Sequence, residues 1–139
     1  KRAMSQAYVL LAHGSRRQQS NQEVQQLAAH LGQQLAAPVE AAFIEQCQPD
    51  LAAACACLLA GGASQIRVLP YLLASGRHLA EDIPALLADC RQRWPQLAIS
   101  CSAHVGGTPL MLTLLADLAS SDNGYSTATT GDSDVSTAG

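Results

Sequence analysis

The sequence has few aromatic residues, few charges and no long apolar run. Aromatic side chains make up 4% and charged side chains 14% of its 139 residues, whereas hydrophobic residues make up 48%. Such a hydrophobic content is typical of a globular protein rather than a disordered one, and alanine and leucine must fill the core positions. No uninterrupted apolar stretch is long enough to cross a bilayer, so we expect one folded domain and no membrane partner.

A surplus of basic residues is also absent. Lysine and arginine together number 8, against 11 acidic residues, which gives a formal net charge of −3. A nucleic-acid-binding protein usually presents a basic face to the phosphate backbone. The charge balance therefore argues against a nucleic-acid partner.

The sequence contains no C-x-x-C pair and no apolar leader. Its 5 cysteines are odd in number and dispersed, which predicts reduced thiols in a cytoplasmic protein rather than disulfides. The start at Lys1–Met4 runs into a predicted strand, so we expect no signal peptide. Because residue 1 is not methionine, an origin as part of a longer fused protein stays open. Cys47 lies near the site discussed below and stays open as a metal ligand.

Alternating short apolar runs and longer amphipathic stretches predict the order βαβαβαβα. Right-handed crossovers would build these units into a parallel four-stranded sheet with helices on both faces, a three-layer αβα sandwich of the flavodoxin-like kind. We assign residues 1–119 to this domain and residues 120–139, rich in serine, threonine, glycine and aspartate, to a disordered tail or linker. Strands are expected at about 7–12, 39–44, 65–72 and 97–103, and helices at about 18–34, 49–60, 79–93 and 109–119.

Local patterns predict how these elements begin, end and pack. Pro70 lies near the end of the third strand, so we expect the regular ladder to stop around it. Pro49 and Asp50 suit the first turn of the second helix. Thr108 and Pro109 suit the N-cap and first position of the fourth helix. The first helix should bury the stripe formed by Val24, Leu27, Ala28, Leu31 and Leu35.

Polar residues follow all four predicted strands. They are His13, Glu45, the loop Ser75–His78 and His104. Parallel strands place their carboxyl ends at one edge of the sheet, which is where open α/β sheets bind ligands. His13 and His78 come after equivalent strands with arginines close by, so we expect the two imidazoles at one site.

Two imidazoles and the Glu45 carboxylate form a donor set for a borderline divalent metal such as cobalt, nickel, iron or zinc. Histidine is largely neutral near pH 7, and three ligands leave coordination positions open for passing the metal on. The same histidines could instead cap the following helices and hydrogen-bond to loop carbonyls. Arg16, Arg17 and Arg77 lie in these loops, either as solvated charges or as a cationic rim for a polycarboxylate or phosphate.

Three motifs, taken in order, resemble the small CbiX/SirB-type sirohydrochlorin chelatases. They are LLAHGSR at Leu10–Arg16, FIE at Phe43–Glu45 and GRHLAEDIP at Gly76–Pro84. The HGS triplet alone is common, whereas the ordered set is specific. The resemblance extends over about residues 7–118.

The resemblance implies a class II chelatase, a lyase that inserts Co²⁺, Fe²⁺ or Ni²⁺ into sirohydrochlorin without ATP, for cobalamin, siroheme or related porphyrin-type synthesis. We expect Co²⁺ first, as a substrate and not as a permanently bound cofactor. On this pattern His13 and His78 bind the metal and accept protons, and Glu45 assists catalysis. A single unit should pair as a homodimer that holds the tetrapyrrole between its subunits. The substrate-binding residues would be Ser15, Arg16, Arg17, Ser75, Gly76 and Arg77.

Two other functions stay open. One is a non-catalytic metal- or tetrapyrrole-binding module of a larger protein. The other is a phosphate-handling hydrolase that uses His13 with Arg16 and Arg17. The commonest motif of that kind has an arginine immediately before the histidine, where this sequence has Ala12. The role of His104 is also open.

Overall fold

The structure is a computed structural model, and it describes residues 5–122. Its contacts divide the chain into two units, one that ends at Thr108 and one that starts at Pro109. None of the helices in the described range is long and apolar enough to cross a membrane. The elements are β1 (Gln6–Ala12), α1 (Gln18–Leu35), β2 (Val39–Phe43), α2 (Leu51–Ala60), β3 (Gln65–Tyr71), a π-turn (His78–Asp82), α3 (Ile83–Arg93), β4 (Ala98–Cys101), a 3-10 turn (Val105–Gly107) and α4 (Leu110–Ser120).

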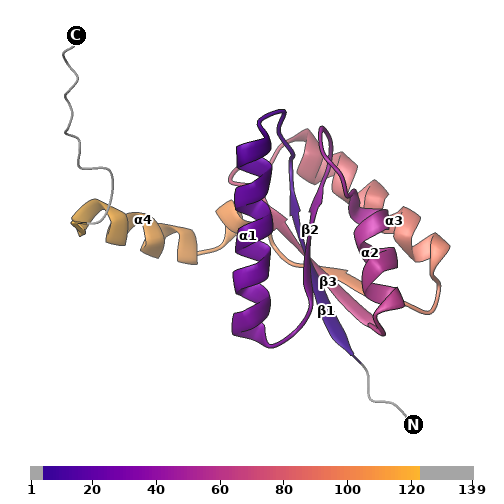
Figure 1. Ribbon diagram of the computed structural model, residues 1–139. Coiled ribbons are helices and arrows are strands. Elements are labelled where there is room, and N and C mark those ends of the chain that lie inside the picture. The colour runs from indigo at the N-terminus through magenta and orange to yellow at the C-terminus, as the bar shows by residue number, and fades with distance from the viewer. Residues whose placement is uncertain (1–4, 123–139) are drawn as a thin grey trace. The chain divides into compact units, whose positions relative to one another are not determined.

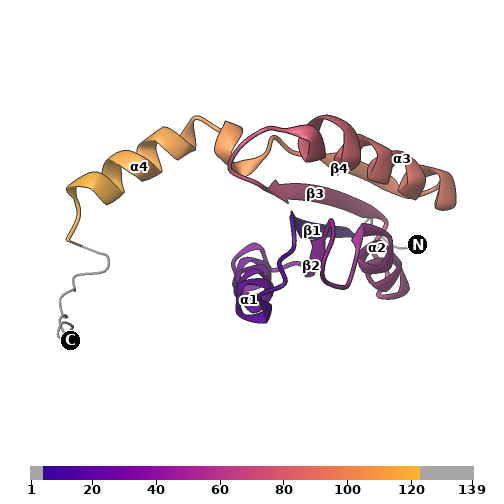
Figure 2. The same ribbon diagram turned by 90° about the horizontal axis from the view of Figure 1, so that it is seen from above.

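The first unit contains a sheet with the strand order β2-β1-β3-β4, in which every neighbouring pair is parallel (Figure 1). α1 covers one face of the sheet, whereas α2 and α3 cover the other (Figure 2). The two central positions go to β1 and β3, which are apolar runs of the kind that parallel sheets bury on both faces. The structure therefore confirms the predicted α/β class, with four parallel strands and flanking helices.

The face of the sheet under α2 and α3 carries the larger apolar core. Alternate residues of each strand point to this face, because successive side chains of a strand lie on opposite sides. Burying one Val, Leu or Ile side chain contributes about 1.5–3 kcal/mol, so this face supplies most of the hydrophobic stabilisation. Its buried members include Val9, Leu11, Ile66, Val68 and Ile99 from the strands and Leu51, Leu58, Ile83, Leu87 and Cys90 from the helices.

The face under α1 has a smaller core. Leu27 and Leu35 are 40% and 42% exposed, so the predicted stripe of α1 is only partly correct. α1 contacts β1 and β2, and its stripe extends past the covered part of the sheet. Leu27 and Leu31 therefore border an open groove of about 450 Å³. Asn21, which the stripe did not include, is buried instead. The residues buried on this face are Leu10, Ala12, Ala28, Ala41 and Phe43.

β3 ends at Tyr71, one residue after Pro70, which agrees with the expectation that the ladder would stop near the proline. Val68 O accepts a hydrogen bond from Ser102 N, on the side of β3 that faces β4. Pro70 follows two residues later and faces the same side. β4 has already ended at Cys101, so the ladder needs no N–H from the proline.

α2 begins at Leu51, although Pro49 and Asp50 were expected in its first turn. Asp50 is the N-cap residue, and its Oδ1 accepts a hydrogen bond from Ala53 N at 2.9 Å. An aspartate cap of this kind satisfies one of the backbone N–H groups that a helix start leaves without a partner. The sequence pattern therefore located the start of the helix correctly to within two residues.

α4 begins at Leu110, with Pro109 as its N-cap residue, so Thr108 is not the cap. α3 is also shorter than the helix expected at 79–93, because the π-turn His78–Asp82 precedes it. A π-turn inserts one residue into the helical repeat, and such turns are frequent at functional sites. Most of the predicted tail, residues 123–139, lies outside the described residues.

Candidate functional site

The carboxyl edge of the sheet brings the ends of β1 and β2 together. The main-chain ladder continues past both strands, since Ile44 N donates to Ala12 O at 2.9 Å. One residue further on, Glu45 N donates to His13 O at 3.0 Å. These backbone bonds hold the two predicted site residues side by side before their side chains make any contact.

Gly14 allows this close approach of the two loops. Its φ is +99°, a backbone conformation that L-residues with a side chain rarely adopt. A Cβ at this position would overlap the carbonyl oxygen of Glu45. The glycine of the HGS motif is therefore required sterically, because it lets the loop after β1 pass against the loop after β2.

His13 and Glu45 also meet through their side chains. His13 Nε2 lies 3.2 Å from Glu45 Oε2, and the two side chains are 43% and 47% exposed. His13 Nδ1 lies 3.0 Å from Gly14 O. A carbonyl oxygen can only accept, so Nδ1 is the donor in this contact. Nε2 therefore faces the Glu45 carboxylate, where either a proton or a metal ion can join the two groups.

The spacing of these two atoms matches two ligands of one metal ion. Bonds of about 2.0 Å at a tetrahedral angle place two ligand atoms roughly 3.3 Å apart. The observed separation of His13 Nε2 and Glu45 Oε2 is 3.2 Å. Within residues 5–122, the side chains that the structure describes form no group of three or more potential metal ligands. The pair can hold an ion by two ligands and leaves its other positions open.

His78 begins the π-turn after β3. β3 pairs directly with β1, with Ala12 opposite Tyr71, so the loop that leads to His78 leaves the sheet beside the loop of His13. The side chain of His78 lies outside the description. The convergence of the two imidazoles therefore stays a prediction, which the strand register supports.

The loop after β1 is held to α1 by a residue that the motif analysis missed. Asn21 Oδ1 accepts from Ser15 N at 3.0 Å, and Asn21 Nδ2 donates to Ser15 O at 2.7 Å. Ser15 Oγ accepts in turn from Arg17 N at 2.9 Å. Asn21 is the buried polar residue of the described chain, at 7% exposure. Asn21 lies three residues before Val24 and seven before Ala28, which is the spacing of one helix face. This spacing was the signal in the sequence that Asn21 would be buried.

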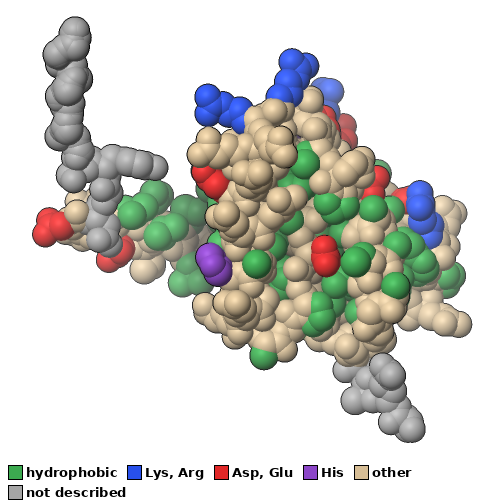
Figure 3. Space-filling model, viewed as in Figure 1, with side chains coloured by type: hydrophobic (Ala, Val, Ile, Leu, Met, Phe, Trp, Pro, Cys, Tyr) green, Lys and Arg blue, Asp and Glu red, His purple; other side chains and the backbone are tan. Residues whose placement is uncertain are grey.

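The remaining predicted substrate-binding residues are on the surface of the same edge. Arg16 and Arg17 are exposed, as is the stretch Ser75–Arg77. Arg77 Nε lies 3.9 Å from Glu81 Oε1, and such an exposed pair contributes little to stability. Lysine and arginine side chains gather at the end of the unit where the strands end (Figure 3). The side chains of Arg16, Arg17 and Arg77 are thus open to solvent at this edge.

A pocket of about 380 Å³ extends from Glu45 toward α3. Its lining includes Asp82 and Asp89 as well as Glu45. Ile83, the next residue of the GRHLAEDIP motif after Asp82, is buried in the core. Asp82, however, is placed by the π-turn in the same pocket as the catalytic candidate Glu45.

His104 and Cys47 have local contacts of their own. The His104 ring lies against Gly107 of its own turn and lines the groove beside α1 together with Tyr71. The lining of that groove does not include His13 or Glu45. Cys47 Sγ donates to the carbonyl of the next residue at 3.2 Å, and its thiol is free. These contacts do not connect His104 or Cys47 to the side chains of His13 and Glu45.

Comparison with known proteins identifies relatives of this chain. The family model CbiX matches residues 7–122. A chloroplastic sirohydrochlorin ferrochelatase of Arabidopsis thaliana is 30% identical over 110 residues, which are 78% of this chain and 49% of that protein. The chain thus spans about half the length, or less, of the first curated relatives it matches.

Solved structures share the fold. A CbiX protein from Marinobacter aquaeolei VT8 has a TM-score of 0.73 at 25% identity, with 82% of this chain and 93% of that chain covered. The sirohydrochlorin chelatase SirB from Bacillus subtilis subspecies spizizenii, solved in complex with cobalt, has a TM-score of 0.73 at 28% identity. That match covers 81% of this chain and 49% of the other. The arrangement of strands and helices is therefore one that experiment has already observed.

Proposed function

Because this chain belongs to the CbiX family, we propose that it is a metal chelatase that inserts a divalent ion, cobalt or iron, into sirohydrochlorin. The curated relatives include sirohydrochlorin ferrochelatases and cobaltochelatases, and imidazole with carboxylate accepts either ion. We propose Co²⁺ as the first metal to test, with Fe²⁺ and Ni²⁺ as alternatives. The observation that carries this proposal is the 3.2 Å approach of His13 Nε2 to Glu45 Oε2.

This pair can exchange a metal ion for a proton. Insertion of M²⁺ into the macrocycle releases two pyrrole N–H protons, and no electron is transferred. His13 Nε2 and the Glu45 carboxylate would hold the ion together. Once the ion has passed into the macrocycle, Nε2 can accept one of the two pyrrole protons. His78 is proposed as the second imidazole ligand and proton acceptor.

The substrate is a polycarboxylate, which needs cationic and hydrogen-bonding groups around the metal. We propose that Arg16, Arg17 and Arg77 bind its carboxylates and that Ser15, Ser75 and Gly76 contribute polar contacts at the same rim. Arginine suits this role because its planar guanidinium binds a carboxylate through two parallel hydrogen bonds. Fixing the macrocycle over the His13–Glu45 pair supplies the orientation that insertion requires.

A homodimer is proposed as the active form, with the tetrapyrrole between the carboxyl edges of two subunits. The chain spans about half of its first curated relative, which is consistent with two units forming one complete site. The partly exposed His13 and Glu45 would be shielded from water by the second subunit. Light scattering that shows a fully active monomer would contradict this arrangement. The cytoplasmic location stays a prediction.

The decisive experiment is anaerobic incubation of the protein with sirohydrochlorin and Co²⁺, Fe²⁺ or Ni²⁺, followed by absorbance. We expect His13→Ala to lower the insertion rate at least about 100-fold, since it removes both a ligand and a proton acceptor. His30→Ala, on the exposed side of α1, is the matched control and should keep the parent rate. An active His13→Ala variant would refute the proposal. Metal binding without any change in the sirohydrochlorin spectrum would instead favour a metal-binding module.

A further inference from the structure

The outer edge of β2 carries backbone groups that the sheet does not use. β2 is the edge strand beside β1, and Tyr8 N donates to Pro38 O while Ile44 N donates to Ala12 O. Alternate residues of a strand face the same neighbour, so the even-numbered residues of β2 face β1. Val39 and Ala41 therefore direct their N–H and C=O groups away from the sheet.

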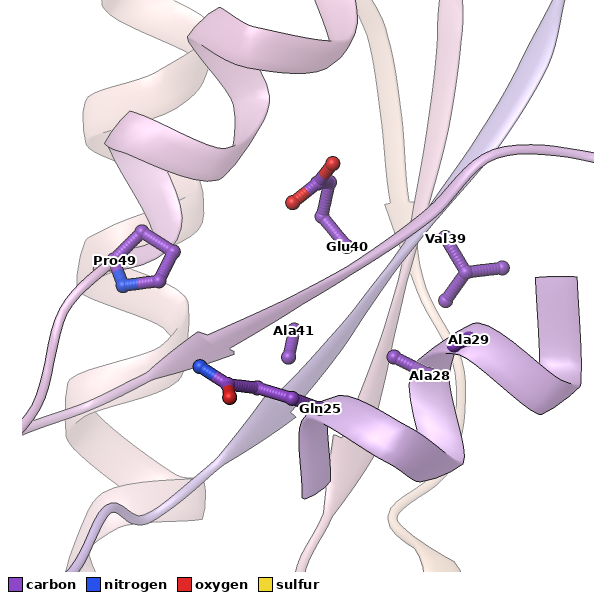
Figure 4. Close-up of a pocket in the computed structure, with 7 residues that line it drawn as sticks. All are labelled: Gln25, Ala28, Ala29, Val39, Glu40, Ala41 and Pro49. Atoms are coloured by element: carbon purple, nitrogen blue, oxygen red, sulfur yellow. The ribbon is translucent and has the colours of Figure 1, made fainter. Parts of the chain in front are cut away.

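These groups lie in an open groove of about 260 Å³ (Figure 4). Ala28 and Ala29 of α1 border the groove on one side of the strand, and Pro49 borders it on the other. Phe43 N, which also faces outward, is occupied by Pro49 O at 2.9 Å. In the described part of the chain, no hydrogen-bond partner meets the outward groups of Val39 and Ala41. Such an edge is a ready template for another strand.

The helix beside this edge carries small side chains. Cys55 of α2 hydrogen-bonds with Cys90 of α3, so that side of α2 faces α3. At 100° per residue, Ala53, Cys57 and Ala60 lie on the opposite side of the helix, toward the edge, and all three are exposed. Hydrophobic and uncharged groups predominate on this face of the unit (Figure 3). A second sheet with its own helices could therefore approach closely.

We propose that β2 pairs through this edge with β2 of a second copy, and that a divalent metal ion joins the two copies at the centre. An antiparallel arrangement about a two-fold axis lets Val39 exchange both hydrogen bonds with the partner's Ala41, and Ala41 with the partner's Val39. Glu40 then lies directly opposite the partner's Glu40.

The side chains around Glu40 form half of a metal site. Cys57 Sγ lies 3.9 Å from Glu40 Oε2. An ion bound to sulfur at 2.3 Å and to oxygen at about 2.0 Å, with a tetrahedral angle, holds these atoms roughly 3.5 Å apart. A small side-chain movement of Cys57 is therefore enough to bind one ion with both groups.

The second copy completes this site. Directly opposite residues of antiparallel strands have their Cβ atoms roughly 4.5–5.5 Å apart, so Glu40 and the partner's Glu40 can reach one ion. Without a cation, two opposed carboxylates destabilise the pairing. With it, two thiolates and two carboxylates form a four-ligand tetrahedral set that suits Zn²⁺ or Co²⁺. Each chain alone supplies two of these ligands, and the structure describes no group of three within residues 5–122.

This site is separate from the proposed chelatase site. Glu40 lies near the start of β2, whereas Glu45 lies beyond its end, at the carboxyl edge. Antiparallel pairing directs the carboxyl edges of the two sheets in opposite directions, so this contact differs from the homodimer contact proposed above and leaves both carboxyl edges available for it. The ligands also differ, because the edge site uses thiolates and the other site uses imidazoles.

The test is a Co²⁺ titration of the double variant His13→Ala and His78→Ala under reducing conditions. These substitutions remove both imidazole ligands of the proposed chelatase site. Absorption and sedimentation velocity are recorded together. We expect a thiolate-to-cobalt charge-transfer band that saturates at about one Co²⁺ per two chains. The sedimenting mass should double relative to the metal-free protein, and a chelator should reverse both changes. Binding of one Co²⁺ per chain, without thiolate absorption or without a mass change, overturns the proposal.

Three further substitutions in the same background locate the site. Cys57→Ser should lose the band and the mass doubling, whereas Cys101→Ser, at a thiol elsewhere, should keep both. Ala41→Pro removes an N–H that the single copy leaves unpaired, so it should keep the thermal midpoint but weaken association at least tenfold. If Cys57→Ser behaves like its parent, the proposal is wrong. In the wild-type background, Cys57→Ser should leave the metal-insertion rate unchanged. The insertion assay therefore tests the chelatase proposal alone, and the titration tests the edge site alone.

Discussion

The two faces of the sheet are built from the same strands and are packed in different ways. The face under α2 and α3 buries large side chains completely, such as Leu51 and Ile66. On the other face, α1 buries the small side chain of Ala28, whereas Leu27 of the same helix is 40% exposed beside an open groove. The alternation of side chains along the strands is equally regular on both faces. Within the first unit, the difference therefore comes from the two helices on one face and the single helix on the other.

The two faces of the sheet therefore contribute differently, one mainly to stability and the other to the position of the site residues. The α2–α3 face supplies most of the buried apolar surface, so substitutions there should unfold the protein without a specific effect on the site. The α1 face meets the loop of His13, which Asn21 holds in place by two hydrogen bonds. Substitutions at that loop should change the site at a smaller cost in stability.

The largest contrast is expected between two leucine truncations. Leu51→Ala removes a side chain that is 0% exposed and leaves a cavity, so the free energy of unfolding should fall by about 2–5 kcal/mol. Leu27→Ala removes a side chain that already contacts water, and should cost less than about 1 kcal/mol. Urea unfolding followed by circular dichroism measures both values. Equal losses would show that the two faces stabilise the protein equally.

A smaller effect is expected from the buried amide of α1. Asn21→Ala leaves the N–H and C=O of Ser15 without their partners and should cost about 1–3 kcal/mol. Because Ser15 lies two residues after His13, the same variant should also slow metal insertion. Gln22→Ala, at the exposed neighbouring position, is the control for both measurements. A variant with reduced stability and an unchanged insertion rate would show that Asn21 does not position the loop.

The smallest effect is a pH dependence of the α2–α3 face. Burial raises the pKa of Cys55 from about 9 to about 12, with a further contribution from Cys90. Above pH 9 the unfolded chain releases this proton while the folded chain keeps it, so stability falls as the pH rises. The free energy of unfolding should be on the order of 1 kcal/mol lower at pH 10 than at pH 8 from this group. Urea unfolding of Cys55→Ala should show a correspondingly weaker dependence, and an identical slope would contradict the assignment.

Much of the fold could be predicted because short apolar runs and amphipathic stretches have different periods. The four strands occur where the runs of Val, Ile and Leu predicted them, within one or two residues at most ends. The main error came from tertiary contacts. The stripe of α1 is partly exposed because this helix contacts chiefly β2 and β1, so part of its predicted apolar face meets no strand.

The candidate site was predictable in part for the same reason. Parallel strands bring their carboxyl ends to one edge, so the proximity of His13 and Glu45 followed from the order of elements. Three details could not be read from the sequence. They are the passage of Gly14 against the Glu45 carbonyl, the bonds from Asn21 to Ser15 and the position of Asp82 in the pocket beside Glu45. Each depends on how a loop is placed against a neighbouring element, which local periodicity does not specify.

The sequence by itself determined which residues form strands and helices, and that four parallel strands would end at one edge with polar residues after each. These properties depend on local periodicity and on the handedness of the chain, which act without knowledge of the final packing. Only the tertiary structure decided that His13 Nε2 and Glu45 Oε2 lie 3.2 Å apart, and that the outer edge of β2 stays open beside Cys57 and Glu40. Such distances result from the packing of all elements together, and no local pattern encodes them.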